Sequence, residues 1–264
     1  MNRYFKSIVL CLIVVFHAQA AFSADEKWNE HRSAHFLIYY RSIPVDFIKT
    51  VERAAEDHYQ EIARGLGFRR EESWLSEKRA KIYIYESADD YMTSAKQYQW
   101  SHGAAFAAEK TIRTFPAAHG FFDSTLPHEM GHIILREFIG LEPKLPLWFE
   151  EGVAMYQEKA KRFGANAVVK NAVENGEFIP LKQLTDMRLY SDSPPQTLEL
   201  FYAESASIVY YMISQLGDHN FVRFCRALKD GKNFSDALKE VYIRFKNLDD
   251  LNRSWLNYLE QIKS

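Results

Sequence analysis

The most constraining feature of this sequence is the pentapeptide HEMGH at residues 128–132. A capping region at Asp123 precedes it, so the pattern predicts a helix in which His128 and His132 lie four residues apart on one face. Two imidazoles arranged in this way can bind one zinc ion, while Glu129, rotated by one residue, can reach a water that the metal activates. The alternative is a solvated or buried histidine pair on an amphipathic helix, because so short a motif also arises by chance. A metal site therefore requires a third ligand from elsewhere in the chain.

A second segment, LPLWFEEGVAMYQE at residues 145–158, predicts another helix with Pro146 in its first turn. It offers two adjacent carboxylates, Glu150 and Glu151. Neighbouring residues on a helix point about 100° apart, so only one of the two can face the metal. The other is expected to be solvated or to support the ligands from behind.

The stretch WFEEGVAMY resembles the Trp-x-x-Glu-Gly-x-Ala segment of gluzincin metallopeptidases, the relatives of thermolysin and aminopeptidase N. In that family the glutamate before the glycine binds zinc, so the resemblance implies that Glu151 joins His128 and His132 around one zinc ion per chain. Residues 133–150, eighteen in number, separate His132 from Glu151, a separation typical of the aminopeptidase N branch. The same resemblance implies that Glu129 is the general base.

Downstream, FYAESASIVYYMISQLG is similar to a Tyr-x-x-small-x-x-aliphatic helix of the same relatives. In those proteins the tyrosine hydroxyl stabilises the oxyanion, which implies a catalytic role for Tyr202. A phenol suits this role because it donates a hydrogen bond to developing negative charge and carries no charge itself. The alternative is that Tyr202 only packs in the core, since the chain contains 15 tyrosines.

The upstream half also resembles peptidase MA-like proteins, so the resemblance covers most of the chain, but the sequence departs from the relatives at two places. Aminopeptidases carry a Gly-x-Met-Glu-Asn strand that anchors the substrate amino terminus, whereas GAAFA at residues 103–107 has no acidic residue. Aminopeptidase activity is therefore not expected. Thermolysin has an aspartate four residues after its glutamate ligand, whereas this chain has Met155, so another group must orient the zinc histidines.

The hydrophobic pattern predicts an α+β fold. Strands are expected at residues 35–40 (HFLIYY) and 81–85 (KIYIY), with short strand-like segments and an edge strand within 103–122. Helices are expected at 45–66, 86–98, 124–138, 146–161, 198–216, 219–228, 234–242 and 248–262. With the resemblance, this implies a thermolysin-like zincin fold. An N-terminal mixed sheet with helices, about residues 25–140, would precede a mainly helical part, about 141–264, with the active-site cleft between them.

The first 24 residues have the layout of a secretory signal peptide. They combine a basic start, an apolar run from Ile8 to Phe16 and small residues, which predicts cleavage after Ala20 or Ala24. The apolar run is shorter than the ~20 residues of a spanning helix, so no stable membrane span is expected after cleavage. We therefore expect residues 25–264 to form the exported domain, periplasmic or secreted.

The charge content argues against one class of partner, and the cysteine content argues against a disulfide. The chain has 33 basic and 35 acidic residues without a long run of either sign, so a nucleic-acid partner is not expected. Cys225 is the one cysteine after the expected signal peptide, which excludes an internal disulfide, and its apolar surroundings predict a buried thiol.

These features predict an exported zinc peptidase that acts on a peptide or protein substrate. Zinc would activate water, Glu129 would act as general base, and Tyr202 would stabilise the oxyanion. The alternative is an exported zinc-containing binding or assembly protein that has the peptidase fold but little or no turnover. The sequence leaves the substrate and the oligomeric state open.

Overall fold

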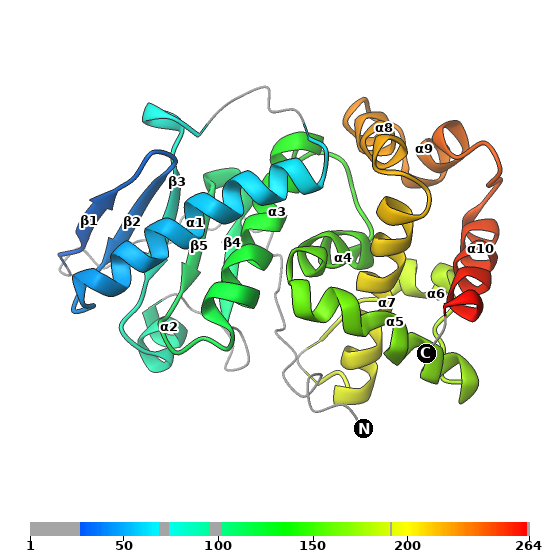
Figure 1. The fold of residues 1–264 in the computed structure, drawn as a ribbon, viewed down its shortest axis with the longest axis horizontal. Helices are drawn as coiled ribbons and strands as arrows, with labels where there is room; N and C mark the ends of the chain where they lie inside the picture. The colour runs from blue at the N-terminus through cyan, green and yellow to red at the C-terminus, as the bar shows by residue number, and fades with distance from the viewer. Residues whose placement is uncertain (1–26, 69–73, 95–101, 191, 263–264) are drawn as a thin grey trace. The chain divides into compact units, whose positions relative to one another are not determined.

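The computed structural model describes residues 27–68, 74–94, 102–190 and 192–262, so the expected signal peptide lies outside the described residues. The chain divides into two compact units (Figure 1). The sheet unit holds the described residues up to Ala63 and those of 69–134, and the helical unit holds Arg64–Phe68 and Leu135–Ser264. The boundary falls inside helix α3, Leu126–Ile139, after Ile134.

The sheet unit is built on a mixed sheet of five strands in the order β1-β2-β3-β5-β4. The central strands β2, β3 and β5 are parallel, and the border strands β1 and β4 run antiparallel to their neighbours. This arrangement confirms the predicted α+β class with a mixed sheet. The strands are β1 (Asn29–Arg32), β2 (Phe36–Tyr40), β3 (Ala80–Ile84), β4 (Gly103–Phe106) and β5 (Thr111–Thr114).

One face of this sheet forms the core of the unit. Phe36, Ile38, Ile82 and Ile112 are fully buried on it, because alternate strand residues share a face. Helix α1, Val45–Gly65, packs against this face through apolar residues spaced three and four apart, and its Tyr59 meets the Phe36 ring edge-on at 5.9 Å. The short helix α2, Ala88–Ser94, follows β3.

The two border strands of the sheet differ in chemistry. The β1 sequence, NEHR, is polar and its ends are exposed, whereas the β4 sequence, GAAF, contains no charged residue. Three of the four β4 residues are buried, and no further strand lies beside β4 among the described residues. The strand predicted near residue 103 is therefore an edge strand, as expected.

The helical unit contains the second half of α3 and the helices that follow it. Helix α7 is its centre, since every residue from Phe201 to Val209 is buried. An aromatic cluster of Trp148, Phe149, Phe224 and Phe234 fills a second part of the core with edge-to-face contacts. The helices are α4 (Leu147–Gln157), α5 (Lys159–Glu174), α6 (Leu181–Asp186), α7 (Pro195–Ser214), α8 (Asp218–Lys229), α9 (Phe234–Val241) and α10 (Leu248–Gln261).

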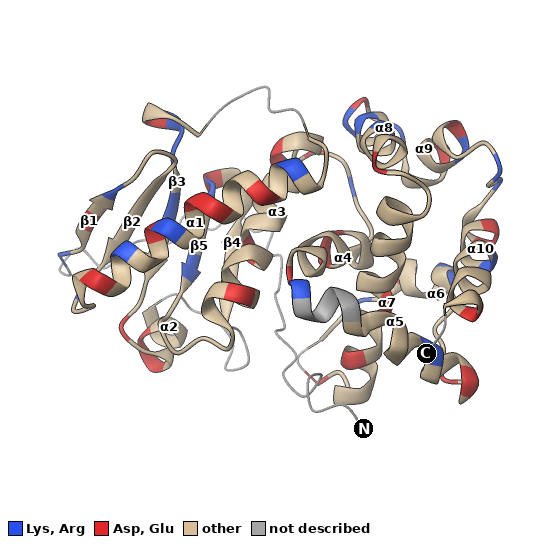
Figure 2. Ribbon diagram, viewed as in Figure 1, with Lys and Arg blue, Asp and Glu red and all other residues tan. Residues whose placement is uncertain are grey.

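The structure departs from the predicted helices mainly after residue 157. The helix predicted at 146–161 ends at Gln157, because Glu158 leaves helical geometry with a ψ of 87°, and α5 then begins at Lys159. Helices α5 and α6 were not predicted. None of the described helices combines the length and the hydropathy needed to span a bilayer. Figure 2 shows basic and acidic residues interspersed along the helices and strands.

Candidate metal centre

Helix α3 brings the two predicted histidine ligands together. A π-helical turn at Phe121–Thr125 leads into α3, and Gly120 starts this turn with a φ of 59°, which glycine adopts without strain. The side chains of His128 and His132 are buried, and their Nε2 atoms lie 3.2 Å apart. Two nitrogen ligands at about 2.0–2.1 Å from a tetrahedral zinc ion would be about 3.3 Å apart, so the pair fits one metal ion.

Glu151 completes the group that could hold a metal. Its side chain on α4 is fully buried, and the ligand atoms of His128, His132 and Glu151 all lie within 4.8 Å of one another. Burying an ionised carboxylate costs several kcal/mol unless a cation balances it, and a divalent metal would supply that charge. Two imidazoles and one carboxylate are also the ligand set of many catalytic zinc sites. The residues present therefore fit the metal.

A buried ion pair fixes the start of α4. Arg136 follows His132 by one helical turn, and its Nε donates to Glu150 Oε1. Both side chains are less than a tenth exposed, so the expectation that Glu150 could be solvated is wrong. Burial raises the pKa of Glu150, and the Arg136 guanidinium opposes that rise.

Arg136 also holds the loop between the two helices. Its Nη1 donates to the carbonyl oxygen of Pro143 at 2.8 Å and to that of Gly140 at 3.4 Å. The residue after Glu150 is the candidate ligand Glu151, so this pair determines where that ligand lies relative to α3. Arg136 was not among the residues predicted from the sequence. A charged residue in the apolar stretch IILREF, eight residues after His128, was the signal that it needs a buried partner.

Close packing of α4 against α7 explains why a glycine, Gly152, follows the candidate ligand. A Cβ at this position would lie 2.3 Å from the carbonyl oxygen of Ser205 and 2.6 Å from Val209 Cγ2, so the backbones of α4 and α7 touch here. Tyr202 lies three residues before Ser205 on α7 and is buried. The close approach thus holds the helix of Tyr202 against the helix of Glu151, while the catalytic role of Tyr202 stays a prediction.

Glu129, the predicted base, is fully buried on α3.

Two other histidines, His102 and His119, lie in the segment before α3. They contact each other, because the His119 backbone N–H donates to His102 Nδ1 at 3.2 Å. His119 is exposed and His102 partly buried. Neither belongs to the group that could hold a metal.

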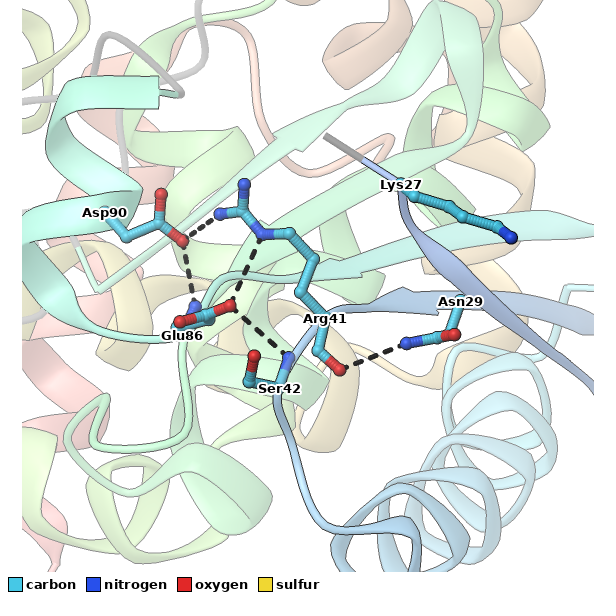
Figure 3. Close-up of a pocket in the computed structure, with 6 residues that line it drawn as sticks. All are labelled: Lys27, Asn29, Arg41, Ser42, Glu86 and Asp90. Carbon is cyan, nitrogen blue, oxygen red and sulfur yellow. Dashed lines mark hydrogen bonds and ion pairs between the residues drawn. The ribbon is translucent and has the colours of Figure 1, made fainter. Parts of the chain in front are cut away.

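A separate hollow of about 600 Å³ lies in the sheet unit (Figure 3). Arg41 at its centre binds Asp90 and Glu86, and its guanidinium lies 4.7 Å from the centre of the Trp28 ring. Arg41, Glu86 and Asp90 therefore satisfy one another, which is typical of a structural ion-pair network. The lining residues are Lys27, Asn29, Arg41, Ser42, Glu86 and Asp90.

Comparison with known proteins identifies the family of the chain. No curated protein matches the sequence. The family model of the peptidase MA superfamily matches residues 70–261, which include α3, α4 and α7 with all the predicted site residues. With that match over most of its length, the chain belongs to the peptidase MA superfamily.

Proposed function

We propose that the chain is a zinc-dependent peptidase in which His128, His132 and Glu151 hold one zinc ion. The observation that carries the proposal is the buried group of these three side chains, with ligand atoms within 4.8 Å. Helix α3, which supplies both histidines, also bears Glu129. The resemblance to gluzincins and the membership in the peptidase MA superfamily support it.

The residues divide the reaction between them. Bound zinc would polarise the scissile carbonyl group and lower the pKa of the attacking water. A Glu129 carboxylate oxygen takes the proton from that water and passes it to the leaving amine. The Tyr202 hydroxyl donates a hydrogen bond to the oxyanion of the tetrahedral intermediate.

The decisive experiment compares metal content and hydrolysis in the same samples. Purified mature protein, Glu151→Ala and Glu129→Gln are assayed for zinc per chain and for cleavage of an unfolded, fluorescently labelled protein. We expect one zinc per chain and chelator-sensitive cleavage in the unchanged protein, and both are lost in Glu151→Ala. Glu129→Gln should keep zinc and lose cleavage by about 10²–10⁴-fold. Glu142→Ala, an exposed carboxylate in the loop before α4, is the matched control.

Two outcomes would contradict the proposal. If the unchanged protein binds no zinc even after zinc is added back, the three residues are not ligands. If zinc binds but no unfolded protein is cleaved, the alternative of a binding or assembly protein with little turnover is favoured. The missing acidic residue in GAAFA is the sequence feature that favours this alternative.

We further propose that the protein is exported, with residues 1–24 as its signal peptide. The basic start and the short apolar run of these residues support this proposal. N-terminal sequencing of protein recovered outside the cytoplasm should begin at residue 21 or 25. An unprocessed N-terminus on the functional protein would contradict export by this route.

A further inference from the structure

The edge strand β4 begins with a glycine whose conformation does not require one. Gly103 pairs with Thr114 in the antiparallel register of β4 and β5. It is not among the glycines with positive φ, so any residue could adopt its backbone geometry. A glycine within a strand weakens the strand and often marks a place where another group approaches closely.

That group is Glu129. A Cβ at Gly103 would lie 2.9 Å from Glu129 Oε1 and 3.1 Å from Glu129 Cγ. It would also lie 2.8 Å from the Cγ2 methyl of Thr125, four residues before Glu129. Carbon atoms in favourable contact are about 3.5–4.0 Å apart, so each of these distances means overlap.

Both neighbours are buried, and the carboxylate of Glu129 is the group that would shift. Glu129 and Thr125 are both fully buried, and the Thr125 hydroxyl donates to the carbonyl oxygen of His119 at 3.1 Å. Both contacts lie within the sheet unit. A methyl group at Gly103 would therefore displace the carboxylate of Glu129, whose end is the more flexible of the two.

We propose that Gly103 is a positioning residue, whose bare backbone on β4 sets the place of the Glu129 carboxylate. This inference rests on the proposed function. A general base must be within about 2.6–3.2 Å of the proton it takes, so a shift of several tenths of an ångström matters. The expected effect is on the chemical step, because the metal ligands do not include Glu129.

The test is Gly103→Ala in the full mature protein. We expect kcat to fall about tenfold to a hundredfold, as when a reacting group is misplaced by up to about 1 Å. KM should change less than about threefold, with zinc content and the urea midpoint close to those of the unchanged protein. Gly65→Ala is the matched control, because Gly65 also has no positive φ and a Cβ there would meet nothing within 4 Å.

Two double variants show whether Gly103→Ala acts through Glu129 or through Thr125. Thr125→Ser removes the overlapping methyl and keeps a hydroxyl, so it should not restore kcat when combined with Gly103→Ala. On a Glu129→Gln background, Gly103→Ala should leave the residual rate unchanged. Restored kcat in the first pair, or a further fall in the second, would overturn the proposal.

The outcomes also distinguish failure of the role of Gly103 from failure of the proposed peptidase function. If the unchanged zinc-loaded protein cleaves and Gly103→Ala cleaves equally well, only the role of Gly103 is overturned. If the unchanged zinc-loaded protein does not cleave at all, the proposed function fails and the role of Gly103 fails with it. If Gly103→Ala loses zinc or unfolds at lower urea while Gly65→Ala does not, Gly103 is structural and the positioning role is wrong.

Discussion

Glu204, in the middle of α7, makes the stability of the helical unit depend on pH. Its side chain is fully buried, and burial raises the pKa of its carboxyl group from 4.5 to about 8. Oε1 accepts a hydrogen bond from the Ile179 backbone N–H at 2.8 Å, which lowers the pKa by less. Oε2 is buried and has no partner among the described residues. At pH 7 the group is therefore mostly neutral in the folded protein and ionised in the unfolded chain.

The direction of the effect follows from the raised pKa. The folded state binds a proton that the unfolded state releases above pH 4.5, so the contribution to stability is fully present below 4.5. It is lost progressively as the pH rises to about 8 and then levels off. With about 1.36 kcal/mol for each pKa unit, the loss between about pH 5.5 and about pH 8.5 is about 3 kcal/mol.

Glu204→Gln removes this titration and keeps an oxygen for the Ile179 N–H. The amide nitrogen can lie unpaired, which costs about 1–3 kcal/mol at every pH, so the informative quantity is how the difference between the two proteins changes with pH. The assay is urea unfolding in chelator at several pH values, because bound metal would add its own pH dependence. Glu199→Gln, a partly exposed carboxylate on the same helix, is the matched control.

We expect the unchanged protein to lose about 3 kcal/mol relative to Glu204→Gln over that pH range. Glu199→Gln should follow the unchanged protein. A difference that stays constant to about 0.5 kcal/mol would refute the reasoning, because it would mean that Glu204 has the same pKa in the folded and unfolded states.

Three further predictions concern the helical unit. Glu150→Ala should lower the free energy of unfolding by about 3–5 kcal/mol, because it leaves the Arg136 charge buried without an opposite charge, and the double variant Arg136→Met with Glu150→Leu should cost less. A cost of less than about 1 kcal/mol for Glu150→Ala would contradict this prediction. Gly152→Ala should lower the free energy of unfolding by about 1–3 kcal/mol and reduce zinc content, because its Cβ would overlap the Ser205 carbonyl oxygen. An unchanged urea midpoint and zinc content would count against this contact. The Cys225 thiol, fully buried with its pKa raised by burial, should react with a disulfide reagent far more slowly in folded than in unfolded protein, and equal rates would show that it is accessible.

Local periodicity was enough to predict most of the fold. Aromatic and β-branched residues in HFLIYY identified β2, and alternating residues in KIYIY identified β3. The apolar spacing of α1 predicted that helix to within a residue. The strand order could not be predicted, because β4 pairs with β5 by tertiary contacts that leave no local signal. Helix α5 was missed because Glu158 interrupts a continuous helical pattern without a proline or glycine at the break.

The candidate ligands were predictable because their chemistry and their spacing appear together in the sequence. HEMGH fixes two imidazoles on one helix face, and the resemblance selects Glu151 over Glu150. The supporting residues were not predictable. The role of Arg136 depends on Glu150 in the next helix. The proposed role of Gly103 depends on the side chain of Glu129, which is far from it in the sequence.

The two borders of the sheet give the protein unequal resistance to self-association. The β1 border carries Glu30 and Arg32, and charges on an edge strand discourage pairing with a second copy. The β4 border lacks such charges and is protected by its short length of four residues and by the burial of three of them. Changes that lengthen β4 or add β-branched residues to it should therefore promote edge-to-edge aggregation of the folded protein, whereas comparable changes in β1 should be tolerated.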